Sequence, residues 1–228
     1  MVKKSDESRK PIIWDCFHRP RRETDAEGAS PHSCGGFFVW EKFMDKRQIE
    51  IIELKKKVES AINNSMPDIQ QLLQLNVNER TISCLIAKYL DDFSVVKISV
   101  DAEYDKHLDR NKVMSLKEYV ENYRANRNKK EEFDCVCEYC KKIKSNEKFK
   151  DTESSKRPDV VIHKRNSDDK NYIVIEVKKN KKCLWDYLKL KYMTSPDGGY
   201  RYKLGIFIYF PQNKPEYAWF VDGFKKTL

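Results

Sequence analysis

Three β-rich segments in the last third of the chain constrain its fold more than any other feature. Residues 159–163 (DVVIH) and 171–177 (NYIVIEV) are short runs of β-branched residues, and the residues between them have the composition of a turn. Helical periodicity follows at 184–192. Residues 202–210 (YKLGIFIYF) are apolar enough for a strand that is buried on both faces. The order hairpin, helix, strand predicts an α/β fold.

The chain before residue 159 divides into regions of different composition. Residues 1–40 hold scattered Pro, Gly and Arg with little periodicity, which predicts an irregular amino-terminal arm. Residues 41–75 form a helical lead-in, in which we expect Pro67 to begin a second helix. Asn78 is placed to cap the helix that follows. These patterns place three helices ahead of the first strand.

The remaining segments complete the expected order of elements. Residues 94–104 read as a strand and 114–128 as a polar helix. Residues 129–157 are dense in Lys and Glu and contain three cysteines, which indicates an insertion. Residues 216–221 are expected to add an edge strand.

The charge balance favours a polyanion as partner. The 228 residues include 45 Lys or Arg and 36 Asp or Glu, a net charge of +9. Segment 151–228 carries 16 basic and 10 acidic residues, so most of the excess lies there.

No apolar run approaches the ~20 residues that span a bilayer, and residues 1–10 lack the apolar stretch of a signal peptide. We therefore expect a cytoplasmic protein with no membrane partner.

The predicted hairpin brings charged residues together. If its turn is centred between Ser167 and Asp168, paired residue numbers sum to 335 and Asp159 lies opposite Glu176, with Cβ atoms about 4.5–5.5 Å apart. Alternation along the strand points Lys178 to the same side as Glu176. Two such carboxylates repel unless a cation lies between them, and Mg²⁺ prefers oxygen ligands of this kind. A metal held there can activate a water for attack on a phosphodiester, with the lysine orienting the water.

A purely structural role is the alternative for the same three residues. Asp159 follows Pro158 and could cap a turn, and Glu176 and Lys178 could form a solvated pair at a sheet edge. Glu176, however, interrupts an otherwise apolar strand. That placement favours a functional role.

The sequence Pro158-Asp159, followed after a hairpin by Glu176-Val177-Lys178, resembles the signature of the PD-(D/E)XK, or restriction-endonuclease-like, nuclease superfamily. The resemblance spans about residues 66–222. Four segments carry it, in the order of one bacterial branch of that superfamily: 78–81 (NERT), 100–104 (VDAEY), 158–163 (PDVVIH) and 174–179 (VIEVKK).

The resemblance implies an αβββαβ core with a mixed central sheet, formed by residues 76–228 with an insertion at about 129–157. It also implies that Asp159 and Glu176 bind Mg²⁺ or Mn²⁺, that Glu79 joins them near the metal and that Lys178 is the catalytic lysine. Glu79 equally suits a structural role, because a helix dipole favours an acid in the first turn. Asp101 and Glu103 match a recurring motif without an assigned role, and either could pair with nearby basic residues.

The implied function is a metal-dependent nuclease that hydrolyses phosphodiester bonds in DNA through a metal-activated water. The alternative is a non-catalytic nucleic-acid-binding or accessory module that keeps the nuclease fold. A third interpretation makes the arm and the cysteines an interaction module that recruits the nuclease to a partner. Cutting both strands of a duplex would be easier for a homodimer.

A lysine cluster follows the second strand of the hairpin. Lys179, Lys181 and Lys182 lie where this strand meets the next helix, and Lys189 and Lys191 continue on that helix. We interpret Lys179, Lys181 and Lys182 as phosphate contacts, which would make binding dependent on salt and independent of base sequence. An ordinary solvated helix face is the alternative.

The cysteines suggest a second kind of metal site. Cys135, Cys137 and Cys140 have spacing that zinc sites use, but they lack a fourth ligand. The arm contributes Cys16, His18, His32 and Cys34, which could form a site of their own or lend the missing ligand. The cofactor expected at these residues is structural Zn²⁺, and the alternative is free thiols in a reducing compartment.

Overall fold

The computed structural model of the chain describes residues 45–91, 98–103, 115–126, 133–145, 157–165, 167 and 170–228, and the backbone at 106–107 and 110–111. The described helices are α1 (Lys46–Gln74), α2 (Glu79–Tyr89), α3 (Lys117–Ala125), α4 (Glu138–Lys144) and α5 (Leu184–Thr194). The described strands are β1 (Ser99–Ala102), β2 (Lys106–His107), β3 (Arg110–Asn111), β4 (Val160–His163), β5 (Asn171–Lys178), β6 (Leu204–Tyr209), β7 (Glu216–Val221) and β8 (Phe224–Lys226). The predicted arm at 1–40, with Cys16, His18, His32 and Cys34, lies outside the described residues.

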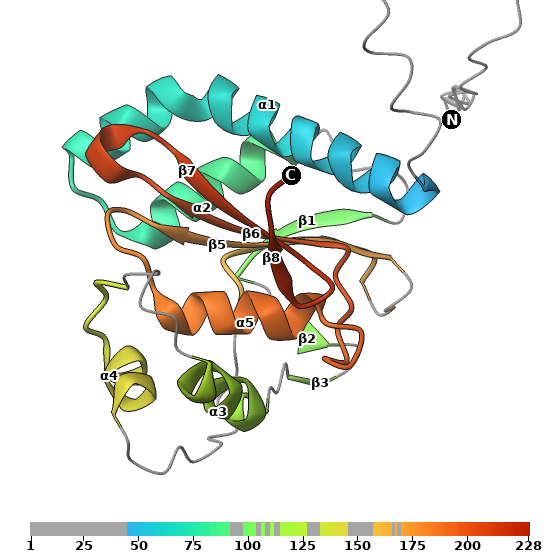
Figure 1. Cartoon of the computed structure of the whole chain (residues 1–228). Helices are drawn as coiled ribbons and strands as arrows, with labels where there is room; N and C mark the ends of the chain where they lie inside the picture. The colour runs from blue at the N-terminus through green and yellow to red at the C-terminus, as the bar shows by residue number, and fades with distance from the viewer. Residues whose placement is uncertain are drawn as a thin grey trace, which may run out of the picture. The chain divides into compact units, whose positions relative to one another are not determined.

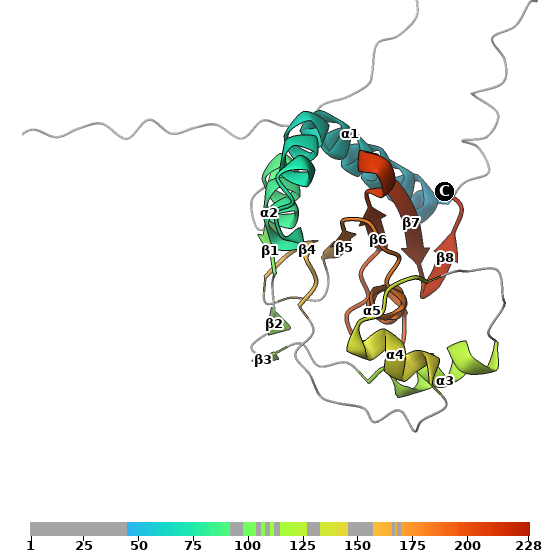
Figure 2. The same cartoon turned by 90° about the vertical axis from the view of Figure 1, so that its left-hand side faces the viewer.

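A six-stranded mixed sheet in the order β1-β4-β5-β6-β7-β8 forms the centre of the fold. Only the β5–β6 pair is parallel within this sheet, and α5 makes the crossover between its two strands. Helices α1 and α2 cover one face, and α5, with α3 and α4 beyond it, covers the other (Figures 1 and 2). The predicted α/β class is confirmed.

The β4–β5 hairpin has the register that the turn composition predicted. Val160 pairs with Ile175, Val161 with Val174 and Ile162 with Ile173, so each pair sums to 335. A register shift follows Ile162, toward the turn. Extending the regular pairing by a single residue away from the turn places Asp159 opposite Glu176.

The inner strands carry apolar residues on both faces because helices cover both. Val161, Val174 and Phe207 pack in one core cluster with α5, whereas Ile162, Ile175 and Ile206 pack in another with α1 and α2. Alternation along each strand therefore divides the sheet between two cores. The expectation that the strand at 216–221 lies at the edge of the sheet is wrong, because β8 pairs with the outer side of β7.

Helix α1 is continuous, which corrects the expectation that Pro67 begins a second helix. A proline inside a helix removes one hydrogen bond and costs roughly 3 kcal/mol. Buried residues on both sides of it, Ile62, Ser65 and Ile69, hold the helix in the core. Tertiary packing therefore outweighs the local cost.

Among the described helices, none combines the length and the apolar character that crossing a membrane requires.

Truncating α1 at its buried face should destabilise the protein. Ile62 is 0% exposed and Ile49, on the same helix, is 37% exposed. We expect Ile62→Ala to lower the free energy of unfolding by about 2–5 kcal/mol, because it leaves a cavity under the sheet. The matched control Ile49→Ala should cost less than about 1 kcal/mol. Equal effects in urea unfolding would contradict the docking of α1.

Candidate active site

Asp159, Glu176 and Lys178 share the face of the sheet that α5 covers. Val174 and Glu176 lie two residues apart on β5, and Val174 belongs to the core cluster on the α5 side. Asp159 has the same relation to Val161 of β4. The predicted side-by-side placement of the two carboxylates is therefore supported by the register and by the division of the core.

Two backbone groups fix the position of Asp159. Its Oδ2 accepts a hydrogen bond of 2.6 Å from the Val177 N–H, and its carbonyl accepts one of 2.9 Å from the Glu103 N–H. Glu103 follows β1 with a φ of 51°, a left-handed conformation that is uncommon for a residue with a side chain. Its carboxylate pairs with Nη2 of Arg80 at 3.0 Å, so α2 and β1 are joined beside Asp159.

Asp101 pairs with two basic residues, one on β4 and one just after it. Its Oδ2 lies 2.9 Å from Nε2 of His163 and accepts from Nε of Arg165 at 3.0 Å. Burial opposes its charge, but His163 and Arg165 outweigh this and hold the pKa of Asp101 below its usual range. Both acids of the 100–104 motif therefore pair with basic residues, as the sequence suggested they could.

Glu176 is buried against two charged residues of α5. Nζ of Lys189 lies 2.7 Å from Oε1 of Glu176 and 2.7 Å from Oδ1 of Asp186. Oδ2 of Asp186 lies 3.3 Å from Nζ of Lys178. The three buried residues Glu176, Asp186 and Lys189 are 1%, 3% and 7% exposed. The strand and the crossover helix thus meet through charges rather than through apolar packing alone.

Glu79 reaches this cluster through lysine. It occupies the first turn of α2, which Asn78 caps by accepting a hydrogen bond from the Thr81 N–H. Its Oε2 accepts from Nζ of Lys178 at 3.0 Å, and its Oε1 accepts from the Lys179 N–H at 3.2 Å. In the described part of the chain, no three carboxylates bring oxygen atoms within 4.8 Å of one another. Glu79 therefore contacts Lys178 and the end of β5, and it does not form a group of three close carboxylates with Asp159 and Glu176.

Burial and charge shift the ionisation of the cluster in opposite directions. Burial raises the pKa of Asp159 to about 6 and raises that of Glu176 well above its ordinary value. Burial also disfavours the ammonium groups of Lys178 and Lys189, but the surrounding carboxylates outweigh it and raise both pKa values. Asp186 stays ionised with a pKa of about 2, because the two lysines overcome its burial.

The charges and lone pairs of the cluster fit a divalent cation. Four carboxylates (Glu79, Asp159, Glu176 and Asp186) surround two ammonium groups (Lys178 and Lys189), a formal deficit of two positive charges. Oε1 of Glu176 and Oδ2 of Asp186 are buried and accept no hydrogen bond of good geometry, although an ammonium lies near each. Carboxylate oxygens with unused lone pairs are the ligands that Mg²⁺ and Mn²⁺ select. Asp159 and Glu176 are the residues of the cluster that could hold either ion.

Two residues of this cluster escaped the sequence analysis. Lys189 was grouped with the surface lysines, and Asp186 was not considered. Both lie on a helix whose other residues from Leu184 to Leu190 are apolar or aromatic and buried. An acid and a base three residues apart on such a helix share one side of it. This pattern was the signal that could have identified them.

The three lysines interpreted as phosphate contacts have different surroundings. Nζ of Lys179 donates to Oδ1 of Asn76 at 2.8 Å and to the Val77 carbonyl at 2.7 Å, which ties the loop before α2 to the end of β5. Nζ of Lys182 lies 5.1 Å from the ring centroid of Tyr209. Lys181 is exposed. Lys181 is thus the member of the three that is best placed for a phosphate.

The cysteines of the predicted insertion meet a further cysteine, Cys183, which precedes α5 as its N-cap. The sulfur atoms of Cys135, Cys137, Cys140 and Cys183 all lie within 4.8 Å of one another. This cluster could hold a metal ion, and Cys183 supplies the fourth ligand that the sequence analysis lacked.

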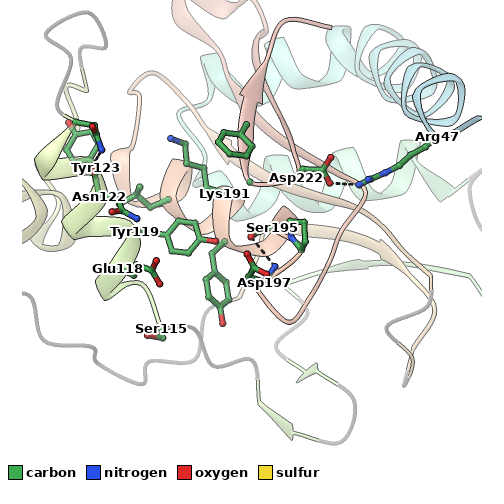
Figure 3. A pocket seen from close by; sticks show the side chains of 16 residues that line it. Arg47, Ser115, Glu118, Tyr119, Asn122, Tyr123, Lys191, Ser195, Asp197 and Asp222 are labelled. Atoms are coloured by element: carbon green, nitrogen blue, oxygen red, sulfur yellow. Dashed lines mark hydrogen bonds and ion pairs between the residues drawn. The ribbon is translucent and has the colours of Figure 1, made fainter. Parts of the chain in front are cut away.

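An open hollow lies at the other end of α5. It is lined by α3, by the end of α5 and by the β7–β8 turn. Figure 3 shows Tyr119, Asn122 and Tyr123 on one side of it, and Asp222 paired with Arg47 on the other. Its lining includes none of Asp159, Glu176 and Lys178. The hollow is therefore distinct from the charged cluster.

Comparison of the chain with protein-family models, with curated proteins and with solved structures found no significant match.

Loss of the buried ammonium of α5 should destabilise the fold. Lys189→Met keeps the length of the side chain but leaves Glu176 and Asp186 without their nearest cation. We expect the free energy of unfolding at pH 7.5 to fall by about 3–5 kcal/mol. Lys191→Met, two residues further on the same helix and only half-buried, should change it by less than about 1 kcal/mol. Equal losses in chemical denaturation would contradict the buried network.

The raised pKa of Asp159 predicts a pH-dependent gain from removing its charge. Because the folded-state pKa of about 6 lies above the unfolded value, ionisation of Asp159 in the metal-free protein removes stability as pH rises from about 4 to 6. In EDTA at pH 7.5, Asp159→Asn should therefore be more stable than the wild type by about 2–3 kcal/mol. The difference should vanish near pH 4.

The control for this experiment is a partly exposed aspartate in the β7–β8 turn. Asp222→Asn removes a surface charge that pairs with Arg47, and its effect should stay within about 1 kcal/mol across the same pH range. An Asp159→Asn variant that is less stable than the wild type at pH 7.5 in EDTA would show that the Asp159 charge is well compensated.

Proposed function

We propose that this protein is a divalent-metal-dependent nuclease that hydrolyses phosphodiester bonds in DNA. One observation carries this proposal: Asp159, Glu176 and Lys178 lie together at the end of the β4–β5 pair, in a cluster with too little positive charge. Neighbouring carboxylates with a lysine form the arrangement that the PD-(D/E)XK resemblance implies.

The order of elements supports the same superfamily. Helix α2 precedes β1, strands β1, β4 and β5 lie side by side, and α5 crosses over to the parallel strand β6. This agrees with the expected αβββαβ order around a mixed sheet. The restriction-endonuclease-like core is therefore included in the proposal.

Asp159 and Glu176 would hold Mg²⁺ or Mn²⁺. Asp159 keeps Oδ1 for this purpose, since the hydrogen bond from Val177 goes to Oδ2. The ion, when bound, would supply Lewis-acid stabilisation of charge on the phosphate and lower the pKa of a water. Glu79 would act through Lys178, whose ammonium donates to its Oε2.

Lys178 would act as a protonated donor. The carboxylates around it raise its pKa, so it keeps its proton at neutral pH. An ammonium has three N–H donors, and one is directed at Glu79, whereas Asp186 lies 3.3 Å away as an ion-pair partner. A remaining N–H can orient the attacking water or offset negative charge on the phosphate. Asp186 and Lys189 touch Lys178 and Glu176 and would act as positioning residues.

The substrate class follows from charge and access. Exposed basic residues lie on the elements that end at the cluster, including Arg80 on α2, Arg157 before β4 and Lys181 after β5. Such residues contact phosphates without reading bases. A polyanionic backbone could therefore be guided to the scissile position while base sequence is left unread.

Cleavage assays test this proposal directly. The full chain should cut plasmid, linear duplex or single-stranded DNA in Mn²⁺ or Mg²⁺, and EDTA should stop the reaction. Glu176→Gln and Lys178→Ala should each lower the rate at least about 100-fold, because each removes a charge at the reacting centre. Thermal melting and circular dichroism verify that the variants fold.

A second acid–lysine pair serves as a matched control. Glu50 and Lys203 form an ion pair at 2.5 Å, at the opposite end of the β5–β6 pair from Lys178. Glu50→Gln and Lys203→Ala should leave the cleavage rate within about twofold of the wild type. DNA binding without hydrolysis in any metal would favour the binding-module alternative. Cleavage that survives Glu176→Gln and Lys178→Ala would indicate a contaminant.

A further inference from the structure

Four cysteines from two distant segments meet beside the amino terminus of α5. Cys135, Cys137 and Cys140 come from the segment that ends in α4, and Cys183 is the N-cap residue of α5. Cys140 and Cys183 are buried, Cys135 is half-buried and Cys137 is exposed. Figures 1 and 2 show α4 on the α5 side of the sheet, and the two helices are in contact.

The spacing of the sulfur atoms suits a single tetrahedral ion. Four thiolates at the usual Zn–S distance of about 2.3 Å stand about 3.8 Å from one another. The sulfurs of Cys140 and Cys183 are 3.7 Å apart, and all four lie within 4.8 Å of one another. A disulfide requires a much shorter S–S distance. A multinuclear iron–sulfur cluster would hold its thiolates further apart than a single ion does.

Backbone donors surround the same sulfurs. The Trp185 N–H donates to the sulfur of Cys140, and the Asp186 N–H donates to the sulfur of Cys183. The Cys140 N–H donates to the sulfur of Cys137. Such N–H groups orient metal-bound thiolates and offset their charge. The first turn of α5 therefore presents backbone N–H donors to the cysteine cluster.

We propose that Cys135, Cys137, Cys140 and Cys183 form a structural zinc site that fixes α4 to the amino terminus of α5. Four protein ligands leave no open position, as in structural rather than catalytic zinc sites. This site is independent of the nuclease proposal, because it uses other residues and another metal.

The segment around α4 depends on such a connection. Helix α4 has seven residues and no side-chain cap, so it is too short to be stable alone. Tyr139 stacks on Trp185 with ring centroids 4.6 Å apart, and the Cys135 N–H donates to the Lys182 carbonyl at 3.3 Å. These contacts join the segment to α5 at the same place as the cysteines.

The zinc site would also position the charged cluster under the sheet. Cys183 precedes Asp186 by three residues, and Asp186 contacts both Lys178 and Lys189. Fixing the N-cap of α5 therefore fixes the first turn that carries Asp186. Loss of zinc should loosen this turn.

Metal analysis of the full chain tests the site. Protein produced with added zinc and purified in reductant without chelator should contain about one zinc per chain. Replacement by Co²⁺ should give the visible and near-ultraviolet absorption bands of tetrahedral thiolate coordination. Cys137→Ser, at an exposed position that should fold normally, should retain at most about a tenth of the zinc.

Two control variants separate this site from the other cysteines. Cys84→Ser, at an exposed position on α2, and the double variant Cys16→Ser/Cys34→Ser in the arm should each keep about one zinc per chain. The proposal is overturned if the wild type contains no zinc, if iron takes its place, or if Cys137→Ser retains full zinc while the arm variant loses it.

Hydrogen exchange tests the structural role of the ion. Removing zinc with a strong chelator should increase amide exchange at 133–145 and 182–188, and leave α1 unchanged. Unchanged exchange in these two segments after zinc is removed would show that the site does not hold α4 and α5 together.

Discussion

The burial of opposite charges between β5 and α5 is the constraint on which the rest of the structure depends. Glu176 lies near the end of β5 and is buried in a sheet that is covered on both faces, where an unpaired carboxylate costs several kcal/mol. Lys189 and Asp186 meet it from one side of α5, and their spacing of three residues sets how this helix is rotated against the sheet. Packing alone would not select that rotation, since α5 is apolar around most of its surface.

Several elements converge on the same end of β5. The first turn of α2 brings Glu79 to Lys178, the residue after β1 bonds the backbone of Asp159, and the N-cap of α5 carries the cysteine cluster. Each contact comes from the end of a helix or strand, where backbone groups are available. The cluster therefore lies on rigid elements, and a cation would find its ligands already in place.

The hairpin register could be predicted from the sequence because its turn composition and apolar alternation are local. The pairing of Asp159 with Glu176 follows from that register alone. Lys189 was misplaced because its role depends on which side of α5 faces the sheet, a tertiary property. The continuity of α1 through Pro67 likewise reflects burial on both sides of the proline. Cys183 could not be joined to Cys140 from spacing, since 43 residues separate them and the fold alone brings them together.

The central claim is that Asp159 and Glu176 hold a divalent cation between β4 and β5. Anomalous diffraction from crystals of the full chain soaked in Mn²⁺ measures this directly. The account predicts an anomalous difference peak within bonding distance of a carboxylate oxygen of each residue, about 2.0–2.4 Å away. A peak at other residues, or none at saturating Mn²⁺ in crystals that keep the same fold, would contradict it.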